Sequence, residues 1–143
     1  NGEFRFYTCA KEFYLIDKYA FDTEALLISG NGANVGYIHY YKGKFNAYQR
    51  TYVLDRIEDN IIFIKYFLDH FLYLRINSEK KEGNTPYIVM STLSEMEIQL
   101  PCIEERTKIA NFLSAIDDKI NHCQSQIENT AVWKKGLLQK MFV

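Results

Sequence analysis

The C-terminal part of the chain carries its most regular hydrophobic pattern. Beyond Pro101, apolar side chains recur at steps of 4, 3, 4, 3 and 4 residues, which is the seam of a coiled coil. The seam residues are Ile109, Leu113, Ile116, Ile120, Cys123 and Ile127. A helix from Glu104 to Met141 would be about 57 Å long at 1.5 Å per residue. Because such a helix is too long to bury against the preceding part of the chain, we expect its seam to pair with another helix.

Toward the C-terminus the seam becomes less regular. The same spacing continues to Thr130 and Lys134, which are polar, and Gly136 costs a helix about 1 kcal/mol relative to alanine. The alternative is a single amphipathic surface helix with Thr130 and Lys134 exposed to solvent. Helices of this length without internal caps favour the coiled coil.

Before Pro101, short apolar and aromatic runs alternate with turns, as in a β-sheet. A continuous apolar run at 25–28 predicts a buried central strand. The other predicted strands are 4–7, 13–16, 35–41 and 45–54, with a glycine-rich turn at 30–34 and a hairpin turn at 42–44. Sequential strands joined by short turns predict a meandering, largely antiparallel sheet.

A predominantly apolar segment at 61–76 predicts a helix buried against this sheet, capped by Asp59 or Asn60. A short strand is expected at 87–90, and the box Thr92-Leu93-Ser94-Glu95 predicts one short helical turn. The fold class is therefore α+β: a small β-rich domain of mixed or antiparallel strands with a packed helix, followed by a long coiled-coil helix. The domain boundaries are 1–100 and 101–143.

Composition places the chain among globular proteins. Its 143 residues are 48% hydrophobic and 15% aromatic, and no apolar run reaches the length of a membrane span. The cysteines, Cys9, Cys102 and Cys123, are far apart and odd in number, which is typical of free thiols in a reducing cytosol. We expect a cytoplasmic protein with no membrane association and no metal site.

Net charge is −1, so any basic surface must be local. Residues 25–54 contain no acidic side chain, and amide and aromatic residues interleave with the basic residues there. Arginine and amide side chains read base edges, while lysines hold phosphates. The candidate DNA-binding residues are Asn34, Lys42, Lys44, Asn46, Gln49, Arg50, Lys80 and Lys81. The alternative is an ordinary solvated face, with the nearby tyrosines packed in the sheet.

No spacing in the chain predicts catalysis. The glycines at 30, 32 and 36 are followed by a predicted strand, whereas a nucleotide loop must open a helix. The run Asn84-Thr85-Pro86-Tyr87 resembles the Asn-Pro-Pro-Tyr motif of amino-methyltransferases but lacks its first proline. Asp117 and Asp118 are adjacent on the predicted helix and so face different directions. We expect no catalytic residues.

The C-terminal helix resembles a known family. From Leu100-Pro101 the chain continues through Glu104-Glu105, Lys108-Ile109-Ala110, Leu113 and Asp117-Asp118-Lys119-Ile120. This run is similar to the helix entry of type I restriction–modification specificity subunits, except that Arg106 stands where the family usually has glutamine. The segment 134–139 resembles the family's closing motif, and 26–28, 32–36 and 43–45 resemble the target recognition domain that precedes the helix.

The resemblance implies a non-catalytic DNA specificity module. Residues 1–100 would be a target recognition domain that reads half of a bipartite sequence in double-stranded DNA. Residues 101–143 would be a spacer and dimerisation helix that also docks methyltransferase subunits. S-adenosylmethionine, ATP and Mg would act in the partner modification and restriction subunits, with no cofactor in this chain.

Full specificity subunits of this family carry two recognition domains and two such helices, and their recognition domains begin with strands that would precede Asn1. The chain is therefore expected to be a half-subunit, a fragment, or a protein that restores the pair by dimerising. A protein–protein scaffold with a dimerising helix and no DNA role is the runner-up. The third hypothesis is that the chain is a fragment of a fused methyltransferase–specificity enzyme.

Overall fold

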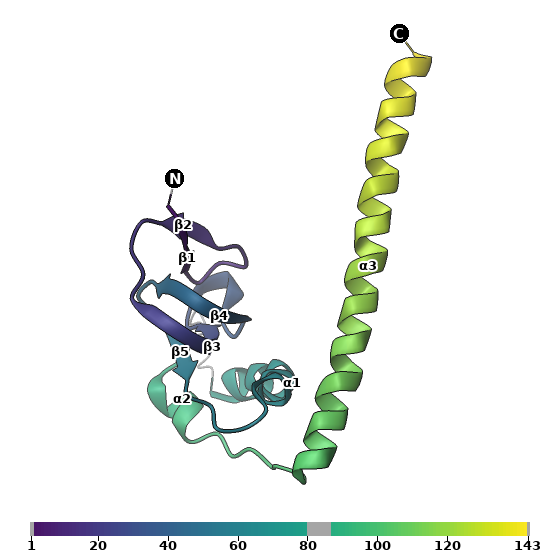
Figure 1. The fold of residues 1–143 in the computed structure, drawn as a ribbon. Helices are drawn as coiled ribbons and strands as arrows, with labels where there is room; N and C mark the ends of the chain where they lie inside the picture. Colours follow the sequence, from purple (N-terminus) through teal and green to yellow (C-terminus); the bar gives the residue numbers. More distant parts are fainter. Residues whose placement is uncertain (1, 80–86, 143) are drawn as a thin grey trace. The chain divides into compact units, whose positions relative to one another are not determined.

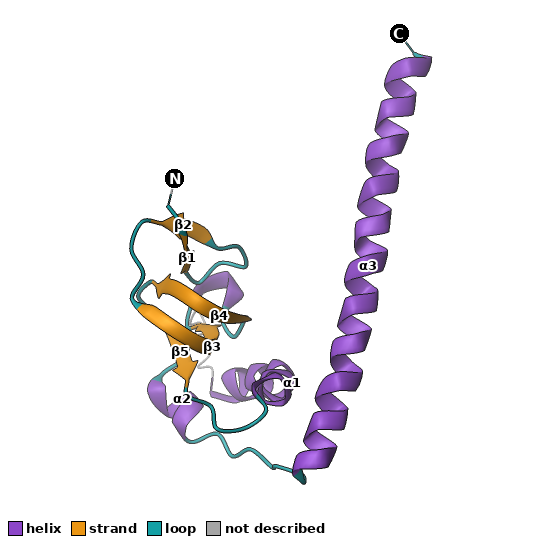
Figure 2. Cartoon of the chain, viewed as in Figure 1, coloured by secondary structure: helices purple, strands orange, loops and turns teal. Residues whose placement is uncertain are grey.

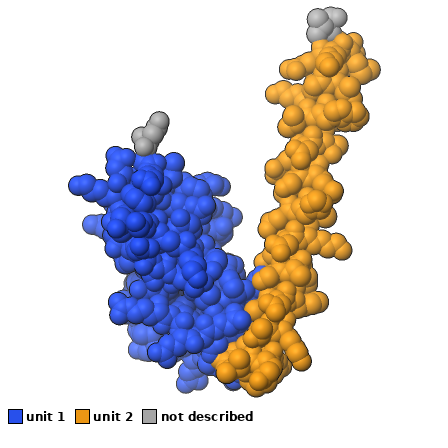
Figure 3. Space-filling model, viewed as in Figure 1, with its two compact units in different colours: residues 1–101 blue, residues 102–143 orange. Residues whose placement is uncertain are grey.

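The computed structural model describes residues 2–79 and 87–142. The chain divides into two compact units, Asn1–Pro101 and Cys102–Val143 (Figure 3). Within the described residues, the first unit contains a sheet, two α-helices and a short 3-10 helix, η1 (Gly32–Asn34), and the second is one long helix.

Five strands form one mixed sheet in the order β2-β1-β4-β3-β5 (Figures 1 and 2). Only the β1–β4 pair is parallel among the strands described, and the other neighbours are antiparallel. The strands are β1 (Phe4–Tyr7), β2 (Tyr14–Ile16), β3 (Phe21–Ser29), β4 (Ile38–Ala47) and β5 (Thr51–Asp55). The predicted α+β fold class is confirmed.

Strand β3 carries the centre of the core. Its run from Ala25 to Ser29 is fully buried, which confirms the buried strand predicted from the continuous apolar stretch. Successive side chains of a strand point to opposite faces. Ala25 and Leu27 therefore share one face of the sheet, where they form a core cluster with Tyr7 and Phe45. Leu26 and Ile28 lie on the other face, so both faces of this strand are covered.

Helix α1 (Ile61–Glu79) contacts β3 and β4 and begins where the sequence predicted. Asn60 is its cap, because its Oδ1 accepts hydrogen bonds from the backbone N–H groups of Ile62 (3.1 Å) and Phe63 (3.0 Å). The helix buries one face through Phe63, Ile64, Leu68, Leu72 and Ile76. A Cβ added to Gly36 would lie 3.0 Å from the Cδ1 of Ile76, so glycine allows this close approach.

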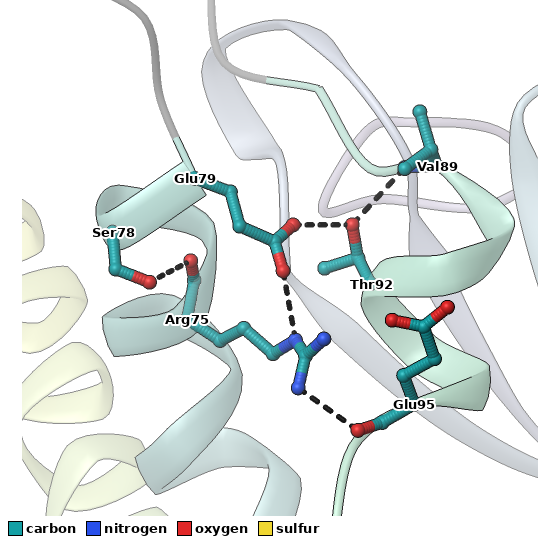
Figure 4. A network of polar contacts seen from close by, with 6 residues as sticks. All are labelled: Arg75, Ser78, Glu79, Val89, Thr92 and Glu95. Atoms are coloured by element: carbon teal, nitrogen blue, oxygen red, sulfur yellow. Dashed lines mark hydrogen bonds and ion pairs between the residues drawn. The ribbon is translucent and has the colours of Figure 1, made fainter.

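A polar network joins the end of α1 to helix α2 (Met90–Ser94) (Figure 4). Arg75 donates from Nε to Glu79 Oε1 (2.9 Å) and from Nη1 to the carbonyl of Glu95 (3.0 Å). The Thr92 hydroxyl donates to Glu79 Oε2 (2.6 Å) and accepts from the Val89 N–H (3.4 Å). Thr92 is thus inside α2 at its third position, and the prediction that it begins the helix is wrong.

Two strand predictions are also wrong. The expected hairpin turn at 42–44 is the middle of β4, which continues through Gly43 at φ 132°. The chain turns instead after Ala47, and β5 pairs with β3 rather than with β4. The sheet is therefore not a sequential meander. The expected strand at 87–90 is reduced to a single bridge between Asn31 and Tyr87, after which α2 begins.

Helix α3 (Ile103–Met141) forms the second unit and confirms the predicted long helix. Glu104 and Glu105 lie in its first turn and Lys140 in its last, where their charges interact favourably with the helix dipole. A hydrogen bond to its own backbone, followed by one with the Cys102 side chain, lowers the pKa of Glu104. Within the described residues, no helix combines the length and apolar character that a membrane crossing requires.

Candidate nucleic-acid interface

Three loops that are distant in sequence are joined by hydrogen bonds, and we call them the loop cluster: residues 8–13, 30–37 and 48–50. The Asn34 side-chain amide donates to the carbonyl of Cys9 (3.1 Å). The Arg50 carbonyl accepts from the Gly30 N–H (2.7 Å) and from the Cys9 thiol (3.3 Å). The chain folds this way because each loop has backbone groups at a strand end that need partners.

Of the predicted DNA-binding residues, the loop cluster contains Asn34, Gln49 and Arg50. Gln49 and Arg50 are exposed at the turn between β4 and β5 and are available to a ligand. The Asn34 amide is already used to hold the loop after β1, so its geometry supports a positioning role. The structure places these three in one cluster although Asn34 and Arg50 are sixteen positions apart in the sequence.

A second group of predicted residues, Lys42, Lys44 and Asn46, lies on β4. Their even spacing places them on one face of the strand. Lys42 lies opposite Glu24 of β3, with 3.4 Å between its Nζ and Glu24 Oε2, and Lys44 lies opposite Asp22. The run without acidic residues in the sequence is therefore adjacent to two carboxylates in the sheet. The face is mixed in charge rather than uniformly basic.

Tyr40 extends the Glu24–Lys42 pair, because its hydroxyl donates to Glu24 Oε1 at 2.6 Å. This hydrogen bond lowers the pKa of Glu24 and raises the pKa of Tyr40. Lys44 Nζ lies 4.9 Å from the ring centre of Tyr19, and Asn46 donates to the carbonyl of Lys18 (3.3 Å). Lys44 therefore keeps a charge at the surface over an aromatic ring.

Two cations that the sequence interpretation missed lie beside aromatic rings near the loop cluster. The Arg5 guanidinium lies 4.3 Å from the ring centre of Phe13 and 4.6 Å from that of Tyr41. Lys11 Nζ lies 5.8 Å from the ring centre of Tyr37. In the sequence these cations differ from others only in lying one or two residues from an aromatic residue, and this is too common in strands to predict a site.

Arg75, Lys80 and Lys81 form a second basic stretch of the sequence, of which Lys80 and Lys81 are predicted DNA-binding residues. Arg75 is engaged by Glu79 and the Glu95 carbonyl in the network of Figure 4. Lys80 and Lys81 lie outside the described residues. Among the residues that the structure describes, no three His, Cys, Asp or Glu side chains gather as metal ligands.

The seam residues form an apolar stripe on α3. Ile116, Ile120 and Ile127 are 40%, 58% and 63% exposed, and Cys123 is exposed as well. Large aliphatic side chains repeated along one helix face at this spacing are those that interlock with a second helix. The predicted pairing of Ile109, Leu113, Ile116, Ile120, Cys123 and Ile127 stays a prediction.

Comparisons with known proteins give a consistent set of relatives. The family model described as "Type I restriction modification DNA specificity domain" matches residues 1–130. The type I restriction enzyme EcoDI specificity subunit of Escherichia coli is 34% identical over 128 residues, which are 90% of this chain and 28% of that protein. The putative type I restriction enzyme MjaX specificity subunit of Methanocaldococcus jannaschii is 32% identical over 116 residues, 76% of this chain and 27% of that protein.

Among solved structures, the S subunit of a type I restriction–modification system from M. genitalium superposes with a TM-score of 0.64. It covers 89% of this chain and 35% of its own length, with 23% sequence identity, so it supports the fold. The chain thus spans between a quarter and a third of the length of the curated relatives it matches.

Proposed function

Because this chain belongs to the type I restriction modification DNA specificity domain family, we propose that it recognises a DNA sequence on behalf of a type I restriction–modification system. The observation that carries the proposal is the family match over residues 1–130, which includes the whole loop cluster. Loops held by a rigid sheet are a common place for binding residues. The exposed Gln49 and Arg50 have side chains suited to base edges.

The two units would divide this work. Residues 1–100 would read one half of a bipartite target, and residues 101–143 would serve as spacer, pairing helix and docking site for methyltransferase subunits. The part of the seam from Ile116 to Ile127 is exposed, while Ile109 and Leu113 are partly buried. This exposed part supports the pairing role, since a rigid helix pair fixes the distance between two recognition domains. The second helix would come from a second copy or from another specificity half. Modification and cleavage, with S-adenosylmethionine, ATP and Mg, would belong to the partner subunits.

The proposal predicts selective and strongly salt-dependent binding to duplex DNA. In a selection from a random-sequence duplex pool, with the methyltransferase subunit present, we expect enrichment of one defined half-site. Apparent affinity should fall steeply between 50 and 200 mM salt, by about 10³-fold if roughly six phosphates are contacted. Binding that is weak and insensitive to salt would instead favour the runner-up, a protein–protein scaffold whose helix dimerises.

Lys44→Ala is expected to weaken DNA binding several-fold without unfolding the protein. If Lys44 contacts a phosphate, the slope of log affinity against log salt should become shallower by about 1. Asp22→Asn, on the opposite strand position, should strengthen binding because it removes a negative charge from the same face.

The control for these variants is Lys135→Ala, which removes the same charge from α3, outside the sheet face. Gel shifts at fixed salt measure all three, and circular dichroism checks folding. Equal affinities for wild type, Lys44→Ala and Asp22→Asn would remove this face from the DNA interface.

A further inference from the structure

A polar hollow of about 330 Å³ lies beside the loop cluster, where the end of β3 meets the start of β5. It is lined by Gly30, Asn31, Arg50, Tyr52, Tyr87 and Ile88. Its walls are fixed by backbone and side-chain hydrogen bonds. The Ile88 N–H donates to the Gly30 carbonyl (2.8 Å), and the Tyr52 hydroxyl donates to the Ile88 carbonyl (2.8 Å). Its shape is therefore set by the fold rather than by a mobile side chain.

Arg50 is held in this hollow by its backbone. Its φ is 65°, in the left-handed region, where a residue with a Cβ costs of order 1 kcal/mol or more. The carbonyl of Arg50 accepts two hydrogen bonds, from the Gly30 N–H and the Cys9 thiol, and these hold that conformation in place. The side chain is nevertheless exposed. The chain thus holds an arginine at a fixed backbone position beside the hollow, with its side chain open to solvent.

We propose that Arg50 is a specificity-determining residue that reads a guanine edge at the mouth of this hollow. The inference rests on the proposed function and assigns one base contact within it. A guanidinium presents a planar fork of donors that pairs with the O6 and N7 acceptors of guanine. A fixed backbone reduces the freedom that the arginine loses on binding, and so sharpens the preference for one base.

Arg56 provides a matched control at the other end of β5. It follows β5 directly, has a φ of 52°, and has a side chain that is 90% exposed. Its Nε lies 3.6 Å from Asp55 Oδ2, and it lies outside both the loop cluster and the hollow around Arg50. Arg50 and Arg56 therefore share backbone conformation, charge and exposure, and differ in their surroundings.

The test is selection from a random-sequence duplex pool by the whole chain with its methyltransferase subunit, followed by affinity measurement on the selected duplex. Arg50→Lys keeps the charge but removes the planar fork, so it should retain the salt slope and the affinity for unselected duplex while it loses affinity for the selected duplex. Its preference for guanine at one position should fall about tenfold, the ratio expected for losing one bidentate base contact.

Arg50→Gly should lose the same preference while its Tm stays equal to wild type or rises, because glycine adopts positive φ at little cost. Arg56→Gly should likewise have a Tm equal to or above that of wild type, but it should select the same DNA sequence as wild type. This contrast separates a role in reading DNA from a role in stabilising the turn.

Retention of the wild-type sequence preference by Arg50→Lys would overturn the inference, as would a selected wild-type target without guanine. Failure of the wild-type chain to select any sequence would contradict the proposed function itself. The two failures are distinguishable because the first requires a selective wild-type protein.

Discussion

Ile116→Asp is expected to abolish pairing of α3. Ile116 lies in the middle of the apolar seam and is followed by Ile120 and Ile127 on the same face. In a paired helix the aspartate would place an unpaired carboxylate in the dry seam, and an unpaired buried charge costs about 3–5 kcal/mol. In a symmetric pair the cost is incurred twice. We therefore expect a dissociation constant more than about 10³-fold higher, seen by light scattering as a change from dimer to monomer.

Ser125→Asp is the matched control for this variant. It introduces the same charge into the same helix, but Ser125 lies on the face opposite the seam. Its oligomeric state should equal that of wild type, and helicity by circular dichroism should be similar in both variants. A wild-type chain that is monomeric, or an Ile116→Asp chain with an unchanged mass, would contradict the pairing role of α3.

Leu27→Ala is expected to destabilise the sheet unit severely. Leu27 is fully buried in β3, within the cluster of Ala25, Tyr7 and Phe45, where the removed atoms leave a cavity. Such leucine-to-alanine changes cost about 2–5 kcal/mol, a large fraction of the stability of a small domain. Urea unfolding followed by circular dichroism should show a correspondingly lower midpoint, and DNA binding should be lost with the fold.

Leu15→Ala on β2 is the control, since Leu15 is 56% exposed and its truncation should cost well under about 1 kcal/mol. The choice of probe matters because Trp133, the one tryptophan of the sequence, lies in α3 and not in the sheet unit. Tyrosine signals from the sheet are therefore the appropriate second probe. Equal urea midpoints for Leu27→Ala and Leu15→Ala would show that the core is not centred on β3.

Hydrophobic spacing was sufficient to predict those helices and strands in which the spacing repeats along the element itself. The seam spacing predicted α3 from Ile109 to Ile127, and the apolar run at 25–28 predicted the buried part of β3. The cap of α1 was predictable as Asp59 or Asn60, because a cap and the N–H groups it accepts from are two and three residues apart. In these cases the decisive interactions lie within one or two helical turns or along a single strand.

Turns and helix ends were less predictable, because the residue types that form them also occur inside strands and helices. Lys42-Gly43-Lys44 has the composition of a hairpin turn, yet Gly43 continues β4 opposite Thr23. Threonine is a common residue at the start of a helix, yet Thr92 lies inside α2 and its hydroxyl donates to Glu79, thirteen residues earlier. In both places a partner from elsewhere in the chain decided between local alternatives of similar energy.

The candidate DNA interface also depends on contacts between residues far apart in the chain, which local patterns do not reveal. Sequence alone selected Arg50 and Lys44 by residue type and neighbourhood, and it assigned the family through the helix motif and its upstream matches.

Residue patterns along the chain were enough to establish a long helix with one apolar seam, a buried strand and a local excess of basic residues. Only the tertiary structure placed Glu24 against Lys42, brought Cys9, Gly30 and Arg50 together, and gave Arg50 its positive φ. The reason is physical: hydrophobic periodicity depends on neighbours a few residues apart, whereas charge pairing across strands and loop contacts depend on strand order and register. Those contacts join residues that are 18 and 41 positions apart in the chain.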